Sequence, residues 1–125
     1  MKIFLPFLKQ SLEDNQVINE KVEIPFILDT SVYSEERWEQ NFPALASKEG
    51  LFQYIERIQS GAVTERVKVA CMLKAIYCFI ESDQINSYKE FAQMFVLSVP
   101  EYTEELITRL KSAFDMVLNG SSVKN

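Results

Sequence analysis

The chain has 125 residues and a net charge of −5, with 47% hydrophobic and 25% charged residues and no histidine. This length and composition are typical of one folded domain that needs no metal or disulfide, and they exclude a disordered chain. The acidic balance argues against a nucleic-acid partner, and the lack of histidine removes the usual general base and the commonest metal ligand.

Residues 1–28 are predicted to form an extended N-terminal arm or a β-hairpin. The segment 3–8 is apolar, the run SLEDNQ (11–16) indicates a polar turn region, and apolar residues alternate with others from Val22 to Leu28. This period of two favours an extended segment with one buried face, and Pro25 restricts that segment to a sheet edge or an extended arm. The two extended segments either pair within the chain, or a neighbouring subunit completes the sheet.

About five helices are expected to follow the arm, from apolar spacing, capping residues and breakers. The predicted ranges are 32–41, a helix from near Ser47 that ends before Gly61, 64–82, a short helix from Ser87 to about Leu97, and 100–119. The predicted fold class is mainly α, a compact bundle of about five helices with an extended or β-hairpin N-terminal arm. It comprises the arm (1–28), a helical domain (29–119) and a flexible tail (120–125).

The helix at 64–82 is expected at the centre of the bundle. Lys74 is the only polar side chain between Val69 and Ile80, so every face of this helix presents apolar surface. The apolar run is too short for a transmembrane helix, which needs about 20 residues. Cys71 and Cys78 lie about 10.5 Å apart along a helix, too far for a disulfide, and are interpreted as reduced core residues.

No catalytic or cofactor motif emerges from the residues. The glycines are isolated, the serines have no histidine to activate them, and the acidic residues Glu35-Glu36, Glu104-Glu105 and Asp14 stand in polar surroundings. Lys74 is interpreted as a lysine whose stem lies along the core while its ammonium reaches solvent or a carboxylate. We therefore expect a non-enzymatic protein without cofactor or metal.

Aromatic residues make up 12% of the chain, more than one small core readily hides. Tryptophan and tyrosine are favoured in protein interfaces, so an exposed remainder would mark a partner surface. The candidate partner-binding residues are Tyr33, Trp38 and Phe42.

Four stretches carry a resemblance to a known family. They are FILDTSVYSEERWEQNFPAL (26–45), LFQYIERI (51–58), LKAIYCFIES (73–82) and the closing FDMVLNGSSVKN. They resemble the small tail assembly chaperones of long-tailed phages and prophages of Gram-positive bacteria, and the block DTSVYSEERWEQNFP is the most specific part. The resemblance covers most of the chain after Leu28 and little of the N-terminal 25 residues.

The resemblance implies a mostly helical protein that binds the apolar tape measure protein and keeps it soluble until the tail tube polymerises around it. It also implies self-association, and a longer frameshifted form that would reach the tail tube protein. A protein of this kind works in the cytoplasm of the bacterial host and is not expected in the mature virion. Neither nucleic acid nor membrane is an expected partner.

Two other classes of function remain open. A regulatory adaptor or inhibitor would bind one folded partner one to one and would itself be a monomer. A small enzyme would use Lys74 or the acidic pairs, and it requires a concave site with a perturbed group. The chaperone reading instead requires multimers and affinity for apolar extended or helical segments.

Overall fold

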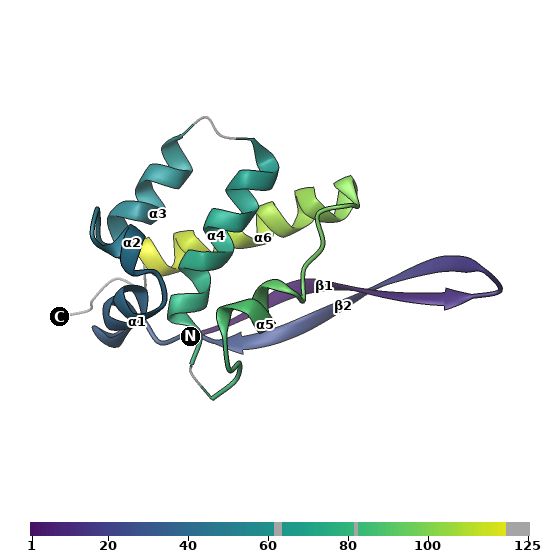
Figure 1. Cartoon of the computed structure of the whole chain (residues 1–125), viewed down its shortest axis with the longest axis horizontal. Helices are drawn as coiled ribbons and strands as arrows, with labels where there is room; N and C mark the ends of the chain where they lie inside the picture. The colour runs from purple at the N-terminus through teal and green to yellow at the C-terminus, as the bar shows by residue number, and fades with distance from the viewer. Residues whose placement is uncertain (62–63, 82, 120–125) are drawn as a thin grey trace.

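The computed structural model describes residues 1–61, 64–81 and 83–119. The elements in chain order are β1 (Lys2–Glu13), β2 (Gln16–Ile27), α1 (Tyr33–Asn41), α2 (Pro43–Ala46), α3 (Leu51–Ser60), α4 (Glu65–Phe79), α5 (Tyr88–Ala92) and α6 (Pro100–Asn119). Figure 1 shows the helices gathered into one body and the two strands leaving that body as a long, twisted hairpin. The predicted tail, 120–125, lies outside the described residues.

Helix α4 lies at the centre of the helical body, as the sequence predicted. It contacts α1, α3, α5 and α6, and its side chains at Met72, Ala75, Ile76, Cys78 and Phe79 have no exposed surface. The preceding helix, α3, lies beside α4 and runs in the opposite direction (Figure 1), as the short link between the two helices favours. Within the described ranges, no helix combines the length and apolar character needed to cross a membrane.

The hairpin is closed by a two-residue turn at Asp14 and Asn15. Both residues have positive φ, 49° and 62°, a conformation that aspartate and asparagine tolerate better than other non-glycine residues. The strands pair in register from Lys2 opposite Ile27 to Glu13 opposite Gln16. The polar run that the sequence suggested as a turn region is therefore strand except at Asp14-Asn15.

The base of the hairpin is part of the hydrophobic core. The buried side chains it contributes are Ile3, Leu5, Leu8, Phe26 and the following Leu28. The ring of Phe26 packs edge-on against that of Phe91 in α5, with 5.6 Å between centroids. Leu28 forms a β-bridge with Ile80, and this pairing ends α4 at Phe79, earlier than predicted.

The predicted fold class, a mainly α bundle of about five helices, is wrong. The described chain holds six helices and a two-stranded antiparallel hairpin, a compact mixed α/β fold. The strands cannot be treated as an accessory arm because their base supplies core side chains. The extra helix is α2, which begins at Pro43, just after the helix predicted at 32–41, because proline suits the first helical position.

Candidate interaction surface

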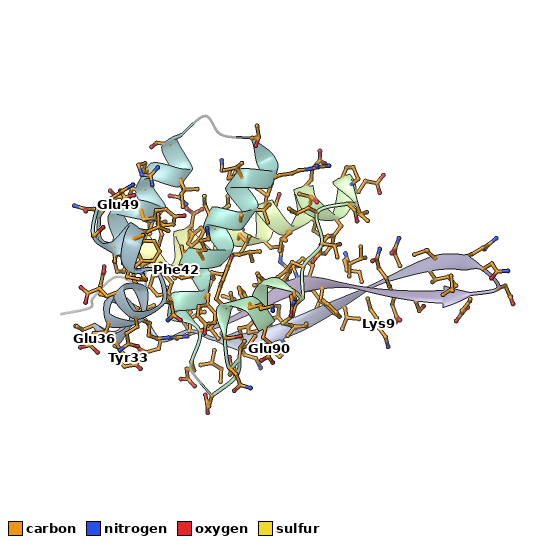
Figure 2. All side chains as sticks on the ribbon, in the orientation of Figure 1. Lys9, Tyr33, Glu36, Phe42, Glu49 and Glu90 are labelled. Atoms are coloured by element: carbon orange, nitrogen blue, oxygen red, sulfur yellow. The ribbon has the colours of Figure 1, made fainter. Side chains whose placement is uncertain are left out.

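The distal hairpin, residues 9–22, projects beyond the helices. Every side chain from Lys9 to Val22 is exposed, whereas the residues at the base of the hairpin are largely buried. Figure 2 shows Lys9 on this projection, well away from Tyr33 and Phe42 on the helical body. A two-stranded ribbon of this kind is held by its own ladder and its turn, and it gains little from the core.

The distal hairpin exposes apolar side chains. Leu12 is 70% exposed and Val17 is 65% exposed, and the two are directly opposite each other across the strands. Cross-strand partners share one face of a sheet, so they form a single small apolar surface near the tip. Ile18 and Val22 are exposed as well, on the other face. Apolar groups left in water at the end of a projection favour contact with another molecule.

The outward-facing backbone groups of both strands have hydrogen-bond partners among the described residues only at the base of the hairpin. The Leu28 amide donates a 2.7 Å hydrogen bond to the Met1 carbonyl, so the odd-numbered residues of the first strand direct their backbone groups toward β2. Because the direction alternates along a strand, the even-numbered residues of β1 direct their N–H and C=O groups outward. At the base, the Phe4 carbonyl accepts from Arg109 Nη2 at 2.6 Å and the Pro6 carbonyl accepts from the Tyr102 hydroxyl at 2.7 Å.

The outer edge of β2 follows the same pattern. The amide of Ile27 donates to Gln84 Oε1 at 3.1 Å, and the Ile27 carbonyl accepts from the amide of Glu81 at 3.1 Å. Toward the tip, the outward backbone groups of Gln10 and Leu12 in β1 have no hydrogen-bond partner among the described residues, and those of Val17 and Asn19 in β2 have none either. An unpaired edge of this kind is a template for another strand.

Helix α6 fixes the direction in which the hairpin leaves the body. The guanidinium of Arg109 donates to both carboxylate oxygens of Glu23, at 2.7 and 2.9 Å, and Lys21 forms a 2.9 Å ion pair with Glu105. The hydrogen bond from Arg109 lowers the pKa of Glu23 below its ordinary value. Glu23 belongs to the base of the hairpin and Lys21 to the end of the distal hairpin nearest the body, so these contacts leave the tip free.

The structure separates the candidate partner-binding residues. Trp38 is 1% exposed, and its indole nitrogen donates to the Glu49 carbonyl at 3.0 Å. Its ring lies 4.7 Å from that of Tyr54 and 5.5 Å from that of Phe42, which is partly buried. Tyr33 is 43% exposed. Trp38 and Phe42 therefore meet in the core, while Tyr33 stands at the surface, and the three do not form one exposed patch.

The groups considered for catalysis have structural contacts. Glu35 accepts a hydrogen bond from the Leu51 amide at 3.1 Å and so caps the start of α3, while Glu105 pairs with Lys21. Burial raises the pKa of the Cys78 thiol to about 12, which keeps that thiol protonated and unreactive. Among the described residues, no group of three or more histidine, cysteine, aspartate or glutamate side chains is placed to hold a metal ion.

One charged side chain is buried that the sequence did not single out. Arg37 is 5% exposed and lies over the Tyr77 ring, 5.2 Å from its centroid. It lines a polar cavity of about 230 Å³ together with Asp29, Tyr33, Glu81 and Asp83. The nearby carboxylates and the aromatic face offset the cost of burying this charge, which gives Arg37 a structural explanation.

Sequence reasoning missed the distal hairpin as a surface. The available signal was the dipeptide Asp14-Asn15, which favours a two-residue hairpin turn and so continues both strands to the tip.

Comparison of the chain with known protein families, with curated proteins and with solved structures found no match in any of the three.

Proposed function

We propose that the protein is a non-enzymatic tail assembly chaperone that binds and solubilises the tape measure protein of a long-tailed phage or prophage. Two things support the proposal: the resemblance of the block 29–43 to that family, and the distal hairpin. The observation that carries it is the projection of Leu12 and Val17 into solvent between two unpaired strand edges. Such a surface binds extended or apolar segments without a pocket specific for one folded partner.

The physical requirements of a holding chaperone agree with this surface. Burying an apolar side chain of the size of leucine or valine contributes roughly 1.5–3 kcal/mol, so a few contacts give reversible binding. Strand addition supplies main-chain hydrogen bonds that do not depend on the client's sequence. The net charge of −5 disperses the resulting complexes.

The proposal is tested by co-expression with the tape measure protein of the same phage or prophage. The wild-type chain is expected to keep the client in the soluble fraction, and the double variant Leu12→Ser/Val17→Ser to lose this effect while staying folded. The matched control is Val32→Ser/Val67→Ser, which removes two exposed apolar side chains of the helical body. Loss of client solubility in the control alone, or in neither variant, contradicts the role of the distal hairpin.

Location and further partners follow from the same proposal. We place the protein in the cytoplasm of the bacterial host during tail assembly and expect it to be absent from the mature virion. A longer frameshifted form would bring in the tail tube protein. An immunoblot of purified phage particles checks the first point: a band at stoichiometric strength would make the protein a structural component of the tail.

A further inference from the structure

We propose that the distal part of β1 pairs antiparallel with the same segment of a second copy of this chain. The two hairpins then form one four-stranded sheet in the order β2-β1-β1-β2, closed by a two-fold axis near Ser11. The proposal concerns two copies alone and is tested without a client. It covers the same Leu12 and Val17 that the proposed function gives to the client, so the dimer is expected to compete with client binding.

The free backbone groups of β1 define where the second copy attaches. The carbonyls of Phe4 and Pro6 are occupied by Arg109 and Tyr102, and Pro6 has no amide hydrogen to donate. The next outward residue is Leu8, and beyond it the outward backbone groups of Gln10 and Leu12 have no hydrogen-bond partner among the described residues. A second strand that stays beyond Leu8 pairs with these groups without displacing the contacts from α6.

Charge selects one register on this edge. In this register Gln10 of each copy lies opposite Leu12 of the other, and the two residues exchange main-chain hydrogen bonds. Lys9 then lies opposite Glu13 of the second copy, in a non-hydrogen-bonded pair whose side chains are closer together. The two-fold axis repeats this pair, so two opposite-charge contacts form. Within the described chain, neither Lys9 nor Glu13 makes a salt bridge or a side-chain hydrogen bond, so both are available.

The same register joins the exposed apolar side chains. Leu12 of one copy becomes a diagonal neighbour of Leu12 of the other, a spacing that long side chains bridge. Each Leu12 already shares a face with Val17 of its own hairpin. The four side chains then cover one another across the centre of the new sheet, which accounts for an apolar pair that is about two-thirds exposed in the single chain.

The edge of β2 is less suited to a second copy. Its complementary charges, Lys21 and Glu23, are already engaged by Glu105 and Arg109 of α6. A two-fold register centred on Glu20 places two glutamates opposite each other, and one centred on Lys21 does the same with two lysines; like charges in these positions destabilise a strand pair.

A charge exchange tests the register. In sedimentation velocity the full chain is expected to form a concentration-dependent dimer, and Lys9→Glu or Glu13→Lys alone to raise the dimer dissociation constant by about tenfold or more, since each places like charges opposite each other twice. An equimolar mixture of the two variants restores opposite charges at both contacts and is expected to dimerise about as strongly as wild type. Glu56→Lys, an exposed position on α3, is the control for net charge.

A proline pair tests which edge is used. Gln10 and Asn19 are opposite each other, point their amides outward and share one side-chain hydrogen bond of 3.0 Å. Gln10→Pro removes an amide that the dimer needs and is expected to give a monomer with an unchanged far-ultraviolet spectrum, whereas Asn19→Pro keeps the dimer. The proposal would be overturned if the wild-type chain stayed monomeric at every soluble concentration or formed open-ended polymers. It would also be overturned if the mixture of Lys9→Glu and Glu13→Lys variants failed to dimerise, or if both proline variants had the same effect.

Discussion

The hydroxyl of Tyr102 donates a 2.7 Å hydrogen bond to the main-chain carbonyl of Pro6, two residues 96 positions apart in the chain. Helix α6 thereby provides a hydrogen-bond partner for an outward carbonyl of β1 at the point where the hairpin leaves the core. This contact marks the border between a hairpin base that belongs to the folded body and a distal hairpin that is available to partners.

Tyr102→Phe removes this hydrogen bond and leaves the Pro6 carbonyl without its partner. We expect the free energy of unfolding to fall by about 1 kcal/mol, since that is the typical net contribution of one such bond. Urea denaturation measures the change. Tyr33→Phe is the control because Tyr33 is exposed, and it is expected to change stability little. Equal stabilities for the two variants would show that the contact does not help to hold the hairpin base.

Arg109→Lys keeps the positive charge on α6 but loses the two-pronged contact with Glu23. We expect a loss of about 1 kcal/mol of stability and faster amide exchange at the hairpin base, because the planar guanidinium cannot be replaced by a single ammonium. Lys111→Arg on the same helix is the control and should leave both the stability and the amide exchange at the hairpin base unchanged.

The same contact predicts a dependence on acid. Arg109 lowers the pKa of Glu23 from its ordinary 4.5, so the stability from this contact is present above about pH 4.5 and is lost as the pH falls below it. Arg109→Met removes the shift, and its unfolding free energy should decline less steeply below pH 4.5. Parallel acid profiles for wild type and Arg109→Met would contradict this account of Glu23.

Trp38 is expected to behave as a core residue. It is the only tryptophan, so the intrinsic fluorescence of the native chain should be blue-shifted and protected from iodide. Trp38→Ala is expected to cost about 3–5 kcal/mol of stability, as for other large aromatic truncations in cores. Tyr33→Ala, at the surface, should cost far less. A red-shifted, readily quenched tryptophan would place this side chain back among the candidate contact residues.

Alkaline conditions should destabilise the fold through Cys78. Burial raises the pKa of this thiol from 9.0 to about 12, so its contribution to stability is intact below pH 9 and falls progressively as the pH rises toward 12. Cys78→Ala should therefore show a shallower decline of unfolding free energy over that range, whatever its stability at neutral pH. A residual decline is expected from Tyr102, whose pKa is also raised by burial. Identical alkaline slopes would contradict a protonated buried thiol.

The helices could be predicted from sequence because their signals are local. α1 and α6 lie where apolar spacing and breakers placed them, whereas α3 begins at Leu51 and not near Ser47. Ser87 caps α5 by accepting a hydrogen bond from the Glu90 amide at 3.1 Å, but α5 ends at Ala92, before the predicted Leu97. The end of α4 could not be read locally. It depends on the bridge between Leu28 and Ile80, which joins segments far apart in the chain.

A hairpin was one of the two forms predicted for residues 1–28, but its continuation to the tip was not predicted, for a physical reason. Its strands bury nothing, so they carry no apolar alternation, and the polar residues from Ser11 to Gln16 look like a loop. The exposure of the candidate partner-binding residues Tyr33, Trp38 and Phe42 could not be read from the sequence for the complementary reason. Aromatic content indicates that some rings are exposed but not which ones, and Trp38 proved to be buried by Phe42 and Tyr54.

The central claim is that the distal hairpin holds an apolar client, and the mass of the co-purified complex tests it most directly. Light scattering on wild type co-expressed with the tape measure protein should give a soluble complex with several copies per client. A variant in which residues 10–19 are replaced by Asn-Gly should keep the helical fold and lose the client. A wild-type chain that ignores the client would contradict the claim, as would a shortened hairpin that still holds it. A one-to-one complex with a folded partner would instead indicate an adaptor.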